Sequence, residues 1–130
     1  MILLDTDICI ELLRGNAKVL SRMQRSSETI AVSFITAGEL YYGAFNSSDP
    51  KSNLRLIKAF LDTLIVIQSD NGIMEEFGGL KAKLRGKGQM LPDADIIVAS
   101  TCLQKCNRLI TGNIKHYHRF ESIKLENWIE

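Results

Sequence analysis

Short runs of aliphatic residues alternate along the chain with longer segments whose apolar residues recur at helical spacing. The first run, Ile2–Leu4, has no polar alternation and is followed at once by carboxylates at Asp5 and Asp7. A short strand of this kind is typical of a parallel sheet that helices cover on both faces. Ligands of such sheets bind beyond the carboxyl ends of the strands, so a functional site is expected at Asp5.

The same alternation continues to the end of the chain and predicts a single α/β domain, residues 1–130. We expect a central, mostly parallel sheet of about four to five short strands, covered by helices on both faces. The expected strands are Ile2–Leu4, Glu28–Ser33, Leu64–Gln68 and Arg108–Thr111, with a terminal extended segment over Ile123–Trp128. The expected helices are Ile8–Arg14 (capped by Thr6 or Asp7), Ala17–Arg25, Phe34–Phe45, Asn53–Thr63, Asp70–Leu84 and one within Leu91–Cys106.

Composition narrows the class of protein. The 130 residues are 45% hydrophobic and 24% charged, with a formal net charge of +1, which is ordinary for a globular domain. No apolar run approaches the ~20 residues of a membrane span, and the start, MILLDTD, lacks the basic segment of a secretory signal. We therefore expect a cytoplasmic protein with no membrane span, whose three cysteines are reduced thiols.

Glu39 is the only charge in Phe34–Phe45 (FITAGELYYGAF), a helical segment that is apolar almost all round. Such a helix is expected to be buried. Two interpretations stay open. Thr36 and Glu39 have the spacing of a capping box, or Ser33 caps the helix and Glu39 lies inside it, where a metal ion would offset the cost of burying its charge.

Asp95 belongs to a helix whose start is marked by Pro92 and Asp93, and Asp93 is expected to cap it. An acid in a first turn ordinarily faces solvent, where the helix dipole stabilises it. At 100° per residue, however, Asp95 shares a face with small or apolar residues, which favours a side chain turned toward the sheet. These neighbours are Val98, Ala99, Cys102 and Cys106.

Asp5, Glu39 and Asp95 thus form a candidate cluster of carboxylates, and the last expected strand would bring Thr111 and Asn113 to the same edge. Like charges in one pocket raise one another's pKa until protons or a metal ion enter. Carboxylate oxygens without histidine or thiolate suit Mg²⁺ or Mn²⁺ better than Zn²⁺. These are the components of a metal-assisted phosphodiesterase.

Basic residues gather near the end of the helix expected over 70–84. Lys81 with Arg85, and Lys83 with Lys87, are four residues apart and form two rows. Cations near a helix C-terminus complement its dipole, which is the structural explanation. Contact with the phosphates of RNA is the functional one.

Several segments occur in a recognisable order: ILLDTDICIELLRG, ITAGELYYG, DADIIVAS, RLITGNIKHYHRF and KLENW. With them the chain resembles, nearly end to end, the PIN domain ribonucleases, in particular the VapC toxins of bacterial and archaeal toxin–antitoxin pairs. The resemblance implies an endoribonuclease that uses Mg²⁺ or Mn²⁺ and often acts on structured RNA such as tRNA. It also implies a homodimer that a cognate antitoxin silences, and RNA products with a 5′-phosphate and a 3′-hydroxyl.

By this resemblance Asp5, Glu39 and Asp95 match the three principal acids of the family. Asn113 stands where many members have a fourth acid, and His116 stands at another position that is frequently acidic; both are departures that put a second metal ion in doubt. The expected roles are direct metal contact by Asp5 and Asp95, contact by Glu39 directly or through water, and positioning of the attacking water by Asn113. Residues expected to support these groups are Thr6, Asp7, Asp93 and Thr111.

Three alternatives remain. The first is a haloacid dehalogenase-like phosphatase with Asp5 as nucleophile, because a buried strand followed by Asp5 and Asp7 also offers an aspartyl nucleophile and an acid. The second is a PIN domain that binds RNA without cleaving it. The third is a zinc site, with candidate ligands Cys102, Cys106, His116 and His118.

Overall fold

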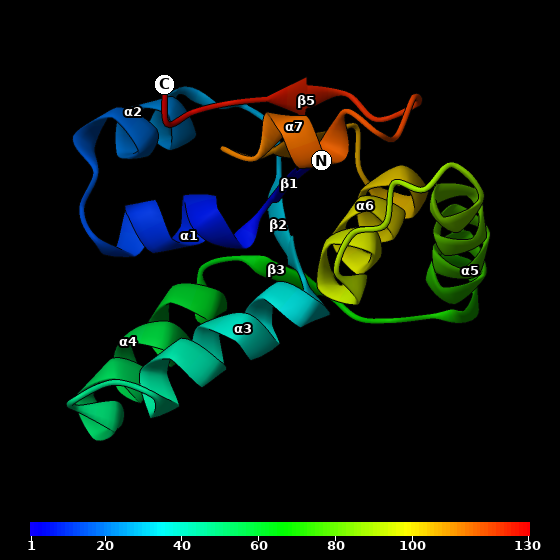
Figure 1. The fold of residues 1–130 in the computed structure, drawn as a ribbon. Helices are drawn as coiled ribbons and strands as arrows, with labels where there is room; N and C mark the ends of the chain where they lie inside the picture. The colour runs from blue at the N-terminus through cyan, green and yellow to red at the C-terminus, as the bar shows by residue number, and fades with distance from the viewer.

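The computed structural model describes residues 1–130, and its centre is one parallel sheet. Five strands follow the order β3-β2-β1-β4-β5, with every neighbouring pair parallel (Figure 1). The strands are β1 (Ile2–Leu4), β2 (Ile30–Ser33), β3 (Ile65–Ile67), β4 (Arg108–Ile110) and β5 (Leu125–Glu126). The predicted α/β fold is confirmed.

Helices cover both faces of this sheet. They are α1 (Thr6–Leu13), α2 (Ala17–Arg25), α3 (Phe34–Phe45), α4 (Pro50–Asp62), α5 (Asn71–Gly86), α6 (Asp93–Lys105) and α7 (Ile114–Tyr117). Buried residues of α1 to α4 join one hydrophobic cluster, and those of α5 to α7 join the other. In Figure 1, α5 and α6 pack together on one side, whereas α3 and α4 run side by side and extend away from the sheet.

The central strand β1 contributes to both clusters. Ile2 and Leu4 pack on the α1–α4 side and Leu3 packs on the other, and all three are fully buried. Burying an aliphatic side chain of this size stabilises the fold by roughly 2 kcal/mol. A strand fixed from both faces therefore carries Asp5, the next residue, at its carboxyl end.

Several helix starts differ from prediction because of their caps. Asp5 itself caps α1, which begins at Thr6, so the expected caps Thr6 and Asp7 are wrong. The α4 helix begins at Pro50 rather than Asn53, since proline suits a first helical turn and Asp49 caps it. The strands β2 and β3 are shorter at their ends than expected.

Two predictions about α3 and α6 are corrected. Glu39 is exposed, as are the large side chains of Tyr42 and Phe45, because α3 extends beyond the sheet and only one of its faces packs. Asp93 is the first residue of α6 rather than its cap; Pro92 takes that position without a side-chain hydrogen bond.

The short helix α7 (Ile114–Tyr117) was not expected. Four residues span hardly more than one turn, which is too short to show a helical period in the sequence. None of the seven helices combines the length and the apolar character needed to cross a membrane.

Candidate active site

Asp5 is held at the carboxyl end of β1 by hydrogen bonds to both of its oxygens. The Thr6 backbone N–H donates to Oδ1 at 2.8 Å, and the Thr111 hydroxyl donates to Oδ2 at 2.8 Å. Thr111 directly follows β4, the strand beside β1, and is fully buried. The prediction that adjacent parallel strands bring Asp5 and Thr111 together is therefore confirmed.

The environment of Asp5 disfavours its charged form. Burial raises the pKa of Asp5, the charge of Asp7 raises it further, and Asp95 adds a smaller effect. The hydrogen bonds from Thr111 and Thr6 oppose these effects, yet the pKa stands at about 6. Asp5 thus lies in a concentration of negative charge that no cationic side chain neutralises.

Glu39 reaches this edge of the sheet through Thr6. The Thr6 hydroxyl donates to Glu39 Oε1 at 2.7 Å and lies 3.0 Å from the Thr36 hydroxyl. Thr6 therefore contacts Asp5 with its backbone and Glu39 with its side chain. Ser33 caps α3 through the Ile35 N–H, so the Ser33 cap is confirmed and the capping box of Thr36 and Glu39 is wrong, whereas the burial expected for Glu39 with that cap is not found.

Asp95 approaches the same edge from the first turn of α6. It is partly buried, as its apolar neighbours on the helix predicted, and its Oδ2 lies 3.3 Å from His116 Nδ1. The charge of Asp95 acts on Asp5, which places the two carboxylates within electrostatic range of each other. Asp5, Glu39 and Asp95 are called the acid site below.

Asp7 accepts a hydrogen bond from the loop after β4. The Gly112 backbone N–H donates to Asp7 Oδ2 at 2.8 Å, while Asp7 Oδ1 is buried without a hydrogen-bond partner. Burial raises the pKa of Asp7 in spite of the hydrogen bond from Gly112. Asp7 therefore supports the site's architecture from outside the acid site.

The other candidate residues take different places. Asn113 is exposed and precedes α7 without a side-chain capping hydrogen bond. Its backbone N–H donates to the Thr111 hydroxyl at 2.9 Å, and its side chain bonds to none of the acids. Asp93 forms an ion pair with Lys81 at 3.0 Å, on the outside of α6. The structure thus links Asn113 to Asp5 only through Thr111.

The two basic rows lie at the end of α5, where Lys81 contacts the start of α6 and Lys87 is the residue after the helix. Lys81 is paired with Asp93, and Lys87 lies 3.6 Å from Glu121. Lys83 and Arg85 form no ion pair and are exposed. Lys83 and Arg85 are therefore the free cations of this group, near the end of α5.

The donors of the acid site fit a hard divalent cation. Asp5, Glu39 and Asp95 do not by themselves form a complete ligand set, and the cysteines and histidines of the zinc alternative form none either, which removes that alternative. The acid site offers carboxylate oxygens and an excess of negative charge around Asp5. Mg²⁺ and Mn²⁺ favour such oxygens, and Mg²⁺ keeps several water ligands rather than requiring an all-protein cage.

Sequence reasoning gave no role to Thr36 or to the Tyr117 hydroxyl. Thr36 is fully buried and contacts Thr6, and Tyr117 is fully buried with a hydroxyl that has no hydrogen-bond partner. The signal for Thr36 was present, because positions three apart on a helix share a face. Nothing in the sequence indicates the position of the Tyr117 hydroxyl.

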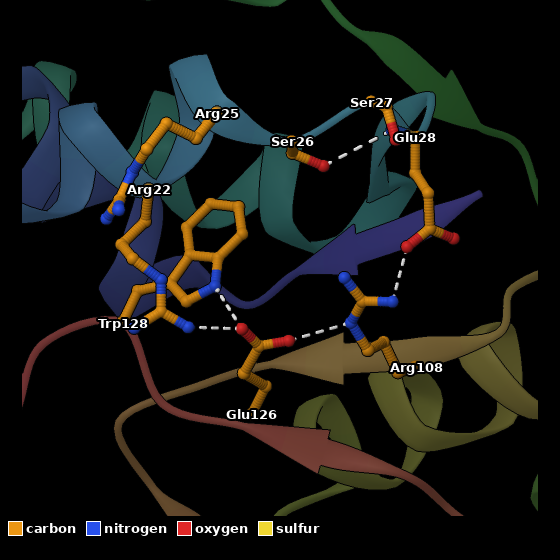
Figure 2. A pocket seen from close by; sticks show the side chains of 8 residues that line it. All are labelled: Arg22, Arg25, Ser26, Ser27, Glu28, Arg108, Glu126 and Trp128. Carbon is orange, nitrogen blue, oxygen red and sulfur yellow. Dashed lines mark hydrogen bonds and ion pairs between the residues drawn. The ribbon is translucent and has the colours of Figure 1, made fainter.

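A second charged region lies toward the opposite edge of the sheet. Figure 2 shows the Arg–Glu network, which consists of Arg22, Glu28, Arg108 and Glu126. Arg22 and Arg108 both pair with Glu126, and Arg108 also pairs with Glu28. The Trp128 indole N–H donates to Glu126 at 3.0 Å. These contacts join α2, β4, β5 and the segment that precedes β2 around an open pocket of about 460 Å³.

An apolar groove begins beside Glu39 and runs between α1, α3 and α4. Its volume is about 420 Å³. Its apolar lining includes Ile10, Leu13, Leu56 and Ile57. The groove therefore joins an exposed apolar surface to one member of the acid site.

Comparison with known proteins identifies the family. A PIN domain model matches residues 2–120. Ribonuclease VapC2 of Haemophilus influenzae is 32% identical over 128 residues, which is 98% of this chain and 97% of the relative. The tRNA(fMet)-specific endonuclease VapC of Salmonella typhimurium is 28% identical over 127 residues, covering 97% and 96%. The crystal structure of DNA-bound VapBC from Salmonella typhimurium superposes with a TM-score of 0.91 at 27% identity and covers 98% of this chain and 97% of that one. The family assignment replaces the phosphatase alternative, since this chain belongs to the PIN domain family, among its VapC members.

Proposed function

We propose that this protein is the endoribonuclease toxin of a toxin–antitoxin pair and that it hydrolyses RNA phosphodiester bonds with Mg²⁺ or Mn²⁺. The observation that carries the metal dependence is the buried Asp5, whose pKa of about 6 reflects burial and neighbouring negative charge. The VapC relatives named as ribonucleases support the choice of RNA as substrate. The cytoplasm is the compartment in which such an enzyme would meet RNA.

Asp5 and Asp95 are the residues that would hold the cation, with Glu39 in contact directly or through water. When bound, a divalent cation of this kind supplies an activated water and neutralises charge on the phosphate. Thr6 and Thr111 keep Asp5 oriented through their hydrogen bonds, and Thr6 restrains Glu39 at the same time. We assign Asn113 the role of positioning the attacking water. The products would carry a 5′-phosphate and a 3′-hydroxyl, and a 2′,3′-cyclic phosphate would contradict this chemistry.

The RNA backbone would contact the basic row of α5. Lys83 and Arg85 are the free cations there, whereas Lys81 and Lys87 would have to exchange a carboxylate partner for phosphate. Neutralising each phosphate contact should reduce the slope of log K against log salt by about 1, equally for all sequences. Binding titrations of Lys83→Gln at several salt concentrations test this, and an unchanged slope would leave Lys83 with a purely structural role.

The apolar groove supports a protein partner. Its lining of exposed aliphatic side chains suits an apolar antitoxin segment, and Glu39 at its border would attract a basic side chain that also reaches toward Asp5. Solved relatives are described as VapBC assemblies.

We also propose that the chain forms a homodimer. As one named relative is specific for tRNA(fMet), tRNA is the first substrate class to test.

The decisive experiment is cleavage of total cellular RNA by the purified protein in Mg²⁺, in Mn²⁺ or in EDTA. We expect metal-dependent fragments from the wild type and none from Asp5→Asn. The matched control is Asp62→Asn, which removes an exposed carboxylate at the end of α4. Absence of wild-type cleavage in both metals, with RNA binding retained, would instead favour the PIN domain that only binds RNA.

A further inference from the structure

A small pocket lies between the end of α5 and the segment that follows α7. Its volume is about 210 Å³, and its lining combines apolar and cationic side chains with one acid and one hydroxyl. The lining residues are Leu80, Lys83, Leu84, Lys87, Arg119, Phe120, Glu121 and Ser122. None of them belongs to the acid site, the Arg–Glu network or the apolar groove.

The floor of this pocket is apolar and its rim is charged. Leu84 and Phe120 are buried in the core cluster of α5 to α7, whereas Lys83 and Lys87 are exposed. Glu121, the only acid of the lining, lies 3.6 Å from Lys87 and pairs with it, so the charge of Lys83 stays free. Pockets for drug-sized ligands measure about 300–1,000 Å³. This smaller one suits a single ring that carries an anionic group.

Arg119 is a fixed cation of the rim. Its Nη1 donates to the backbone carbonyls of Gln89 and Met90, both at 3.2 Å, and its guanidinium forms no ion pair. A guanidinium has five N–H donors, so those on Nε and Nη2 remain free. The planar fork that they form matches the oxygens of a phosphate. The two carbonyls therefore hold Arg119 at the pocket with donors left for an anion.

The chain connects this pocket closely to the acid site. Arg119 lies three residues after His116, whose Nδ1 is 3.3 Å from Asp95 Oδ2. Three residues span at most roughly 11 Å between Cα atoms. Met90, which accepts a hydrogen bond from Arg119, precedes Asp95 by five residues. One RNA strand can therefore contact the pocket and the acid site at the same time.

We propose that this pocket binds one unpaired nucleotide of the substrate RNA, with its base on the apolar floor and its phosphate between Lys83 and Arg119. The inference rests on the proposed function, because it takes RNA as the ligand. Proteins read RNA mainly at unstacked bases of loops, bulges and ends, which aromatic and arginine side chains contact. The pocket would select RNAs that present an unpaired base a short distance from the cleaved bond.

The test measures RNA binding in EDTA, so that neither cleavage nor a metal ion contributes. The probes are a short oligouridylate and an oligomer of the same length whose nucleotides lack bases. Wild type should bind the oligouridylate about 10-fold more tightly, as expected for one base on an aromatic surface. Ser122→Phe fills the pocket without changing its charge and should lose this preference. Ser27→Phe, at an exposed serine beside the Arg–Glu network, is the matched control and should keep it.

Arg119→Gln tests the phosphate contact. It should reduce the slope of log K against log salt by about 0.7, the value for one phosphate of a single strand. Arg25→Gln, at an exposed arginine of α2, is the control and should leave the slope unchanged. A lower Tm with an unchanged slope would overturn the phosphate contact and leave Arg119 as a residue that fastens Gln89 and Met90. This variant also decides the inference if Ser122→Phe does not fold.

The outcomes separate this inference from the proposed function. If wild type cleaves cellular RNA but a folded Ser122→Phe keeps the full preference for oligouridylate, the pocket binds no base and the proposed function stands. If wild type cleaves no RNA in either metal, yet Ser122→Phe abolishes its preference for bases, the pocket is confirmed and the proposed function fails. Equal binding of both oligomers by wild type overturns the inference. Displacement of the oligouridylate by an equal concentration of uridine monophosphate would overturn it too, because the pocket would then serve free nucleotides.

Discussion

The acid site and the Arg–Glu network both contain partly or fully buried carboxylates, but only the network supplies guanidinium groups to pair with them. In the network, hydrogen bonds from Asn107 and Arg108 lower the pKa of Glu28. Burial by itself would raise the pKa of Glu126, but hydrogen bonds from Trp128 and Arg22 and the pairing with Arg108 lower it. In the acid site, the pKa of Asp5 is raised to about 6.

The opposite pKa shifts of the two regions correspond to two different roles of carboxylate groups. Arg–carboxylate pairs with several hydrogen bonds tie elements together, and here they connect segments from α2 to the last strand. Carboxylates without a cationic side chain destabilise the fold but remain available to an external cation. The fold thus contains one region in which charge is neutralised internally and another in which it is kept for a ligand.

The largest expected effect is on catalysis at the acid site. Asp95→Asn should lower the rate of RNA cleavage by about 100-fold or more, because it removes one of the charges proposed to hold the cation. Single-turnover cleavage in Mg²⁺ measures the rate, and Glu126→Gln in the network is the control that should cleave like wild type. A rate for Asp95→Asn within about threefold of wild type would remove Asp95 from the proposed metal ligands.

Asp5→Asn, which should abolish cleavage, should make the metal-free protein more stable. The native pKa of Asp5, about 6, lies above the ordinary value of 3.8. The native state therefore pays an ionisation penalty that appears as pH rises above 3.8 and is complete above about 6. Allowing for weaker hydrogen bonds to the amide, we expect a gain of about 2 kcal/mol at pH 7 that vanishes near pH 4. Urea unfolding in EDTA across this range measures it. A loss of stability at pH 7 would show that the Asp5 charge is compensated after all.

Gly112→Ala tests how much the loop after β4, whose backbone donates a hydrogen bond to Asp7, contributes to stability and cleavage. A methyl group at Gly112 would lie 2.7 Å from Asp7 Oδ2 and 2.8 Å from Ile129 Cδ1, so both side-chain ends would have to move. We expect a destabilisation of about 1.5 kcal/mol and slower cleavage, since the loop also carries Asn113. Thermal unfolding checks the first effect. Gly78→Ala, on a helix with open space around the new methyl group, is the control and should be neutral or slightly stabilising.

The smallest effect on stability is expected in the Arg–Glu network, where the charged form of Glu126 stabilises the fold whereas the charged form of Asp5 destabilises it. Glu126→Gln should destabilise the fold by about 1 kcal/mol at pH 7, a value reduced because solvent reaches these partners. The pKa of Glu126 is lowered, so its contribution is present above the ordinary value of 4.5 and is lost as pH falls through the native value. The stability difference from wild type should therefore shrink in acid. If it instead grew toward low pH, the ion pairs would not be its source.

The fold and the position of Asp5 could be predicted because their signals are local. An aliphatic run that ends in an acid identifies a buried strand and its carboxyl end, and Ser33 before an apolar run predicts a helix start. The burial of Glu39 was predicted wrongly by the same local reasoning. Composition showed an apolar helix, but only the packing of α3 against α4 beyond the sheet decides which of its faces meets solvent.

The sequence by itself determined the parallel α/β architecture, the strand end that carries Asp5 and the acids that accompany it, because each depends on neighbouring residues and their periodicity. Only the tertiary structure decided that Thr6 connects Asp5 with Glu39, that Thr111 donates to Asp5, and that Arg108 neutralises Glu126. Hydrogen bonds and ion pairs act over a few ångströms between residues far apart in the chain. Their partners, and the pKa values that follow from them, are therefore fixed only when the strands and helices pack.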